Sequence, residues 1–154
     1  MLSDRNEMNN RLIKLAESPT SRFWRVEYDV LSTPERVFLN IWELESEVNN
    51  GGFDQYFFNS SGRLVPNVVA ALHAIGASAM AQVVQRAIEA VGQDVQWQDD
   101  TARQVYMTEL SPQATNTLSD LDQAFYRYPD DLTMLLYRYV SERRAEIGGV
   151  PKEF

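Results

Sequence analysis

Few side chains in this 154-residue sequence are of the kinds that carry catalysis. His73 is the single histidine and there is no cysteine, which excludes disulfides, thiolate metal ligands and a cysteine nucleophile. The string around His73, Ala70-Ala71-Leu72-His73-Ala74-Ile75, is apolar. That setting favours a hydrogen-bonded interior histidine over a catalytic base. The serine hydrolase elbow and the glycine-rich phosphate and dinucleotide loops are absent, so the sequence indicates a non-enzymatic protein without catalytic residues or a cofactor.

A metal site is not expected either. Carboxylate metal sites in helical bundles use Glu-x-x-His pairs, and the position three residues before His73 is Ala70. Glu43 and Glu47 lie on one face of an expected helix, where they could hold a hard cation. Paired glutamates at this spacing are more often solvated, and we therefore predict no metal site.

The most informative stretch is Glu45–Gly62, ESEVNNGGFDQYFFNSSG. Its helical pattern is expected to stop after Val48, because asparagine and glycine in Asn49–Gly52 supply the left-handed conformation that ends a helix. A second turn is expected at Asn59–Gly62. The chain should therefore form a rigid corner between two turns.

The aromatic residues inside this corner fall at helical spacing. Phe53, Tyr56 and Phe57 share one face of a single helical turn, and Asp54 and Gln55 lie opposite. This pattern predicts a short helical turn with its aromatic face buried.

The string NGGF-x-Q-Y-F-x-N-S-x-G in this corner resembles the signature of a bacterial all-helical family. It is carried by Asn50, Gly51, Gly52, Phe53, Gln55, Tyr56, Phe57, Asn59, Ser60 and Gly62. The family is typified by a DNA-mimic protein that occupies a helix-turn-helix transcription factor, and most members have no assigned function. The resemblance extends over Pro34–Gly92. It implies an all-α fold and a possible homodimer, with motif residues that act mainly as architecture.

A ligand or peptide pocket is the alternative for the corner, since amides beside aromatic rings are typical of specific pockets. Asn50, Gln55 and Asn59 would be its polar groups. We favour a structural role in which these amides satisfy buried backbone groups.

The longest amphipathic helix is expected to begin at Thr33-Pro34, a capping hydroxyl followed by proline. Its apolar stripe leaves Glu35, Asn40, Glu43 and Glu47 largely outward. Further helices are expected over 6–17, 66–75, 77–91 (ending at Gly92), 99–110, 118–128 and 130–148, with helix or irregular packing over 18–32.

These patterns together predict an all-α fold, a single compact bundle of about six to eight helices. We expect one domain over residues 1–154. It would comprise an N-terminal helical segment (1–32), a family core (33–92) and acidic C-terminal helices (93–154).

The net charge is −8, which argues against binding to nucleic acid or anionic membranes and favours a basic protein partner. Residues 87–131 hold nine acidic and two basic side chains, a local charge of −7. The N-terminus lacks the apolar core of a signal peptide. Polar residues also interrupt the uncharged stretch 64–85, which we interpret as two buried helices. We expect a cytoplasmic protein.

Two interpretations of the acidic residues stay open. They can start helices and solubilise outer faces, or they can imitate the phosphates of duplex DNA. The resemblance favours the second, in which a carboxylate face would occupy a helix-turn-helix regulator. The candidate contact residues are Glu43, Glu47, Asp54, Asp99, Asp100, Asp120, Asp122, Asp130 and Asp131. An immunity-type inhibitor of a basic toxin is a further alternative with the same charge.

Overall fold

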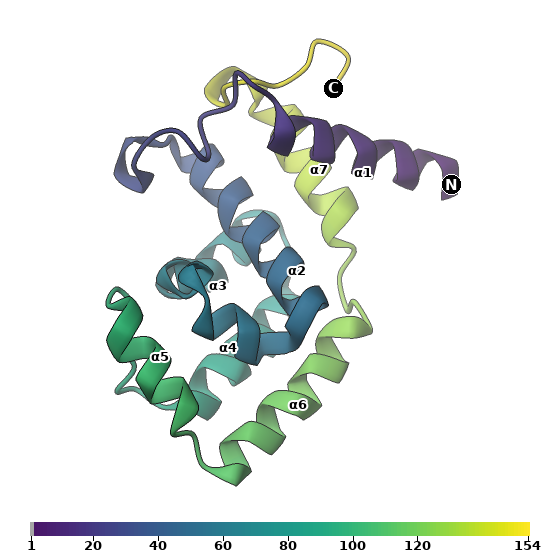
Figure 1. The fold of residues 1–154 in the computed structure, drawn as a ribbon. Coiled ribbons are helices and arrows are strands. Elements are labelled where there is room, and N and C mark those ends of the chain that lie inside the picture. Colours follow the sequence, from purple (N-terminus) through teal and green to yellow (C-terminus); the bar gives the residue numbers. More distant parts are fainter. Residues whose placement is uncertain (1) are drawn as a thin grey trace. The chain divides into compact units, whose positions relative to one another are not determined.

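The computed structural model describes residues 2–154, and within them it contains seven α-helices, three short 3-10 helices and no strand. The predicted all-α class is confirmed (Figure 1). The elements are α1 (Leu2–Glu17), η1 (Tyr28–Val30), α2 (Thr33–Phe58), η2 (Ser60–Leu64), α3 (Val65–Ala74), α4 (Ser78–Val91), α5 (Asp100–Thr108), α6 (Pro112–Tyr126), α7 (Leu132–Glu142) and η3 (Arg144–Glu146).

The chain divides into two compact units. The terminal unit combines the described residues up to Leu39 with Asp131–Phe154, and the central unit is Asn40–Asp130. A single functional domain over residues 1–154 stays a prediction. None of the helices among residues 2–154 is both long and apolar enough to cross a bilayer.

In the terminal unit, α1 packs against α7. Leu12 and Leu15 on α1, and Leu136 and Val140 on α7, are almost completely buried, so the apolar stripes of both helices are used. The chain over 18–32 is mainly irregular, as expected. The last helix, α7, ends at Glu142 and is shorter than the predicted helix over 130–148.

The start of α2 differs from the prediction in its capping residue and in the position of Glu35. Ser32, not Thr33, caps the helix: its hydroxyl accepts the Glu35 N–H at 3.2 Å, and its own N–H donates to the Glu35 carboxylate at 2.9 Å. This reciprocal pair is a capping box. Glu35 is 1 % exposed, not outward, because Arg22 and the Gly148 N–H also donate to it. Burial alone would raise the pKa of Glu35, but these donors outweigh it and the pKa is lowered.

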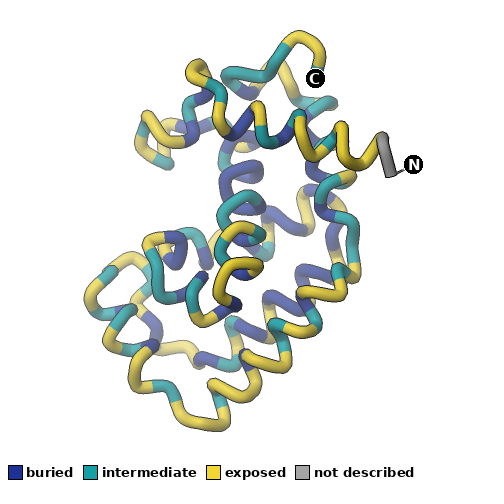
Figure 2. The backbone as a smooth tube through the Cα atoms, turned by 45° about the vertical axis from the view of Figure 1, so that its right-hand side comes forward, coloured by how far each residue is buried: buried dark blue, intermediate teal, exposed yellow. Residues whose placement is uncertain are grey.

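The core of the central unit is built around α4, which packs against α3 and α6. Ala77, Ala81 and Ala87 are at most 1 % exposed, so small side chains let the neighbouring helices approach. The expected helix end at Gly92 is confirmed by its positive φ of 87°. Figure 2 shows α6 buried along its inner side and exposed along its outer side.

Two predictions of burial in this unit are wrong. His73 is exposed, because α3 turns its buried face through Val68 and Leu72 and leaves position 73 on the solvent side. Asn40, expected outward, is 1 % exposed. An apolar neighbourhood in sequence does not fix the side of a helix on which one residue falls.

Candidate functional site

Helix α2 is broken at the glycine pair of the motif. Gly51 has φ −155° and ψ 19°, and Gly52 has φ 76° and ψ −177°. Asn49 and Asn50 remain in the helix, so the predicted turn exists but begins two residues later. The Gly52 conformation is not the left-handed helical one that we expected, but a region that is essentially open to glycine alone.

A carboxylate from α6 holds the chain immediately after this break. The Phe53 N–H donates to Asp122 Oδ1 at 2.8 Å. A Cβ atom on Gly52 would lie 2.4 Å from Asp122 Oδ2. Gly52 is therefore required both by its backbone angles and by the close approach of Asp122.

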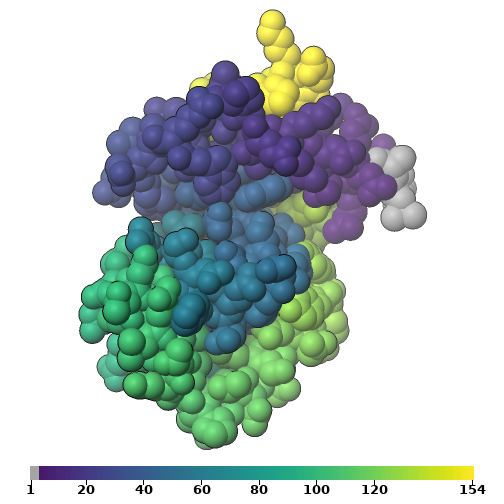
Figure 3. Space-filling model, viewed as in Figure 1, coloured from purple at the N-terminus to yellow at the C-terminus, as the bar shows by residue number. Residues whose placement is uncertain are grey.

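The aromatic turn is buried as predicted. Phe53, Tyr56 and Phe57 are each 0 % exposed. Phe53 meets Phe125 of α6 edge-on with ring centroids 5.9 Å apart, and Phe57 meets Trp97 at 5.1 Å. Figure 3 shows this corner of the chain between α5 and α6 on one face of the central unit.

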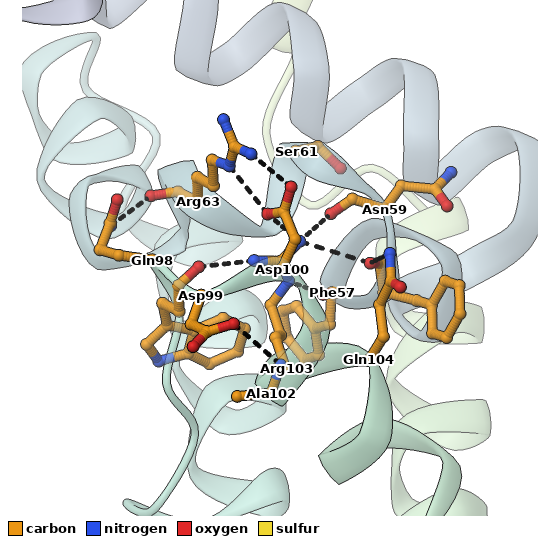
Figure 4. A network of polar contacts seen from close by, with 12 residues as sticks. Phe57, Asn59, Ser61, Arg63, Gln98, Asp99, Asp100, Ala102, Arg103 and Gln104 are labelled. Carbon is orange, nitrogen blue, oxygen red and sulfur yellow. Dashed lines mark hydrogen bonds and ion pairs between the residues drawn. The ribbon is translucent and has the colours of Figure 1, made fainter.

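Arg103 of α5 is the residue that closes the corner, and its side chain is 0 % exposed. Its guanidinium donates to the carbonyls of Phe57 at 2.8 Å, Asn59 at 2.9 Å and Trp97 at 2.6 Å (Figure 4). The first two belong to the end of α2, where carbonyls lack helical partners and carry partial negative charge. A Cβ on Gly62 would lie 2.4 Å from Arg103 Nε, so this glycine admits the guanidinium.

Asp100 balances the charge of Arg103. Its Oδ1 accepts from Arg103 at 2.9 Å and from Arg63 Nε at 2.8 Å. The hydrogen bonds from Arg63 and then Arg103 lower the pKa of Asp100 to about 2. Asp100 therefore belongs to the architecture of the corner.

The motif amides form a network around one carboxylate instead of capping the backbone. Glu47 accepts from Gln55 Nε2 at 2.6 Å and Asn59 Nδ2 at 3.2 Å, while Asn50 Nδ2 donates to Gln55 Oε1 at 3.2 Å. The expectation that these amides satisfy backbone groups is therefore wrong. Arg103 donates to the backbone carbonyls of the corner, and the motif amides donate to the Glu47 carboxylate.

Sequence reasoning missed Arg103 and the role of Asp122 in holding Phe53. The available signal for Arg103 was its register: it lies one helical turn before buried Met107, on the inward face of α5. Nothing local in the sequence pointed from Asp122 to Phe53, which lies 69 positions away.

Three of the nine predicted contact residues hold helix starts. Asp99 caps α5 through the Ala102 N–H at 3.0 Å, and Asp131 caps α7 through the Met134 N–H at 3.2 Å. Asp130 accepts the Met80 N–H at 2.8 Å near the start of α4. These carboxylates have structural roles that compete with contact to a partner.

Two other predicted residues are free of such roles. Asp54 and Asp120 are exposed, and neither forms a hydrogen bond or ion pair with the described residues. They are available to a partner without cost to the fold.

Two pairs of neighbouring carboxylates, Glu43 with Glu47 and Asp54 with Asp122, lie on α2 and α6 of the central unit. Burial and then the charge of Glu47 raise the pKa of Glu43. Burial raises the pKa of Asp122, and the charge of Asp54 raises it further, while the hydrogen bond from the Phe53 N–H lowers it. No Lys or Arg among the described residues pairs with any of these four carboxylates; Glu47 and Asp122 accept hydrogen bonds from neutral N–H donors only.

A hollow of about 330 Å³ lies beside the motif. It is lined by Asp54, Gln55, Phe58, Asn59, Met107 and Thr108. The structure thus brings two of the three motif amides to a cavity wall, while Asn50 lies outside the lining. Among residues 2–154, no three His, Asp or Glu side chains are grouped so as to hold a metal ion.

Comparison with known proteins gave one match. A family model described as DMP19-like protein matches residues 29–143. No curated protein and no solved structure matches the chain significantly.

Proposed function

The chain belongs to the DMP19-like protein family, and on that premise we propose that it is a non-enzymatic, acidic protein-binding module. We infer that it acts as a DNA mimic that occupies the basic DNA-binding surface of a transcription regulator of the helix-turn-helix class. Its mechanism is occupancy: the regulator's basic surface is kept from its operator. We propose that it does so in the cytoplasm of a bacterial cell.

The observation that carries the proposal is that four carboxylates, Glu43 with Glu47 and Asp54 with Asp122, lack a Lys or Arg partner among the described residues. Glu43 and Asp122 are partly buried, and burial together with a neighbouring carboxylate raises the pKa of each, which disfavours their charged forms in the free protein. A basic partner would bring positive charge next to these carboxylates. Binding would therefore stabilise their charged forms relative to the free protein. The net charge of −8 would also accelerate encounter with a basic surface.

Of the nine candidate residues, we propose that these four and Asp120 provide the contact. Asp99, Asp130 and Asp131 hold helix starts, and Asp100 is neutralised by two arginines. Reversing the charge of any of these latter four, or of Glu47 or Asp122, which accept hydrogen bonds within the motif, would test the fold together with binding.

Affinity capture from an extract of the source cell tests the proposal directly. The purified protein serves as bait, and bound proteins are eluted first with short duplex DNA and then with salt. We expect a basic DNA-binding protein in the duplex eluate, with binding that weakens steeply as salt rises. Recovery of no such protein, or binding that is insensitive to salt, contradicts mimicry.

Charge reversal then locates the surface. Asp54→Lys with Asp120→Lys should abolish capture while the far-UV circular dichroism and melting temperature stay unchanged. The matched control is Asp94→Lys with Glu27→Lys, which changes the net charge equally at two other exposed acids. Full capture by the first variant would remove the proposed surface.

A small-ligand or peptide site at the Asn50–Gly62 corner is the second candidate, and the hollow beside Gln55 and Asn59 favours it. If the capture experiment recovers no basic protein, the result supports ligand binding at this hollow. Capture of a basic toxin that duplex DNA does not release would instead support an immunity-type inhibitor.

A further inference from the structure

The hollow beside the motif has the size of a small binding site. Its volume of about 330 Å³ lies at the lower end of the range for ligand pockets, roughly 300–1,000 Å³. The second half of α2 supplies one wall and the end of α5 supplies the other. It can take one large side chain.

The apolar part of the hollow is fixed in place. Met107 is 5 % exposed and forms part of the core, and Phe58 is half-buried. The side chain of Gln104 on α5 donates to the Phe58 carbonyl at 3.4 Å, which ties the two walls together. A preformed cavity loses little conformational entropy on binding.

The hollow offers three hydrogen-bond acceptors, the side-chain oxygens of Asn59, Thr108 and Asp54, while the amide nitrogens of Gln55 and Asn59 each donate one of their two N–H groups to Glu47. Asn59 Nδ2 donates to Glu47 and its Oδ1 stays available as an acceptor, and Figure 4 shows this amide directed away from Arg63. The Thr108 hydroxyl donates to the Val105 carbonyl at 2.7 Å, so its oxygen can only accept. Both polar atoms of Gln55 are already bonded. With the carboxylate of Asp54, the hollow calls for a ligand rich in donors.

The charge at the hollow favours a cation. Asp54 has no Lys or Arg partner, and Asp122 repels it. The hollow also lies at the C-terminal end of α5, where the helix carries partial negative charge. The nearby positive charge of Arg103 is buried and paired with Asp100 and the α2 carbonyls, so it does not satisfy Asp54.

We propose that this hollow is a socket for an arginine side chain of the protein partner, an inference that rests on the proposed function. A guanidinium presents five N–H donors in a plane, which suits Asp54, the Asn59 oxygen and the Thr108 oxygen. Its flat face can lie on the Phe58 ring and its methylene stem against Met107. Lysine offers a compact, strongly hydrated charge and fits this combination less well.

The test uses nuclear magnetic resonance titration of the full-length, isotope-labelled protein with three capped tripeptides, Gly-X-Gly, where X is arginine, lysine or citrulline. Citrulline keeps the shape of arginine without its charge. We expect saturable shifts at the Met107 methyl and the Asn59 side-chain amide with the arginine peptide. Binding should be at least about tenfold weaker with citrulline and several-fold weaker with lysine.

Asp54→Asn should weaken binding of the arginine peptide at least about tenfold, a change in binding free energy of about 1.4 kcal/mol. The control is Glu109→Gln, which removes the same charge next to Thr108 but lines a different hollow of similar volume. It should leave the affinity unchanged. Equal shifts with citrulline, equal affinity after Asp54→Asn, or no shift at Met107 would overturn the socket.

These results are separable from the capture experiment. A captured DNA-binding regulator together with an arginine peptide that does not reach Met107 removes the socket and leaves mimicry standing. Selective arginine binding at Met107, with no basic DNA-binding protein in the extract eluate, keeps the socket and removes mimicry.

Discussion

At the scale of single residues, the most consequential side chain is an arginine inside an acidic protein. Arg103 is fully buried, yet its charge is matched by Asp100 and by the carbonyls that end α2. A buried charge is tolerated when it is paired and its donors are used. A Cβ atom on motif residue Gly62 would meet both the guanidinium and the Phe57 carbonyl to which it donates.

Replacing Arg103 with Met should destabilise the protein by about 3–5 kcal/mol, because the buried carbonyls of Phe57 and Asn59 and the carboxylate of Asp100 lose their donor. Urea denaturation measures the free energy of unfolding. Arg63→Gln is the control: it removes an exposed partner of the same carboxylate and should cost much less. Equal losses in the two variants would show that burial of Arg103 is not the cause.

The stability contributed by Asp100 should depend on acid pH. Its pKa is about 2 in the folded chain, against 3.8 for the free side chain. The unfolded state therefore binds more protons between these values, and stability is lost as pH falls from about 4 to about 2. The difference in unfolding free energy between the wild type and Asp100→Asn should be largest above pH 4 and shrink toward pH 2. A difference that is constant over this range contradicts the role of the arginine pairs.

At the scale of elements, the broken helix α2 positions everything at the candidate site. The break at Gly51 and Gly52 redirects the chain, so that three aromatic side chains enter the core while Asp54 stays exposed. Asp122 of α6 fixes the new direction by accepting the Phe53 N–H. A continuous helix would carry Asp54 and Asn59 to other faces, and the hollow beside them would not form.

The break should be sensitive to substitution in a way that depends on Asp122. Gly52→Ala meets both backbone strain of about 1–3 kcal/mol and a clash with the carboxylate. In an Asp122→Ala background the clash is gone and only the strain remains. A double-mutant cycle of unfolding free energies should therefore give a smaller cost for Gly52→Ala when Asp122 is absent. Additive costs would mean that the carboxylate moves aside freely.

At the scale of the whole molecule, the excess of negative charge is divided between structure and surface. Helix capping and arginine pairing use Asp99, Asp100, Asp130 and Asp131. On α2 and α6 in the central unit, Glu43, Glu47, Asp54 and Asp122 have no cationic partner, and burial and then repulsion by a neighbouring carboxylate raise the pKa of Glu43 and of Asp122. Such repulsion in the free chain is the expected cost of a surface kept for a basic partner.

Removing one of these charges should separate stability from binding. Glu43 is partly buried and its pKa is raised, so above pH 5 its ionisation opposes folding. Glu43→Gln should leave the free energy of unfolding at neutral pH unchanged or raise it, while capture of the basic partner weakens. Calorimetric unfolding and the capture assay measure the two effects. Lower stability together with full capture would assign Glu43 to the architecture.

The sequence by itself determined the all-α class, most helix bounds and the buried aromatic turn. These depend on periodicity and on neighbours within a few positions, as with Asp99 before α5 and Gly92 after α4. Only the tertiary structure decided that Glu35 is buried, that His73 is exposed, and which acidic side chains are already occupied. The physical reason is distance along the chain: Arg103 meets Phe57 across 46 positions, Asp122 meets Phe53 across 69, and Glu35 meets Gly148 across 113. No local pattern encodes such partners, because packing brings them together.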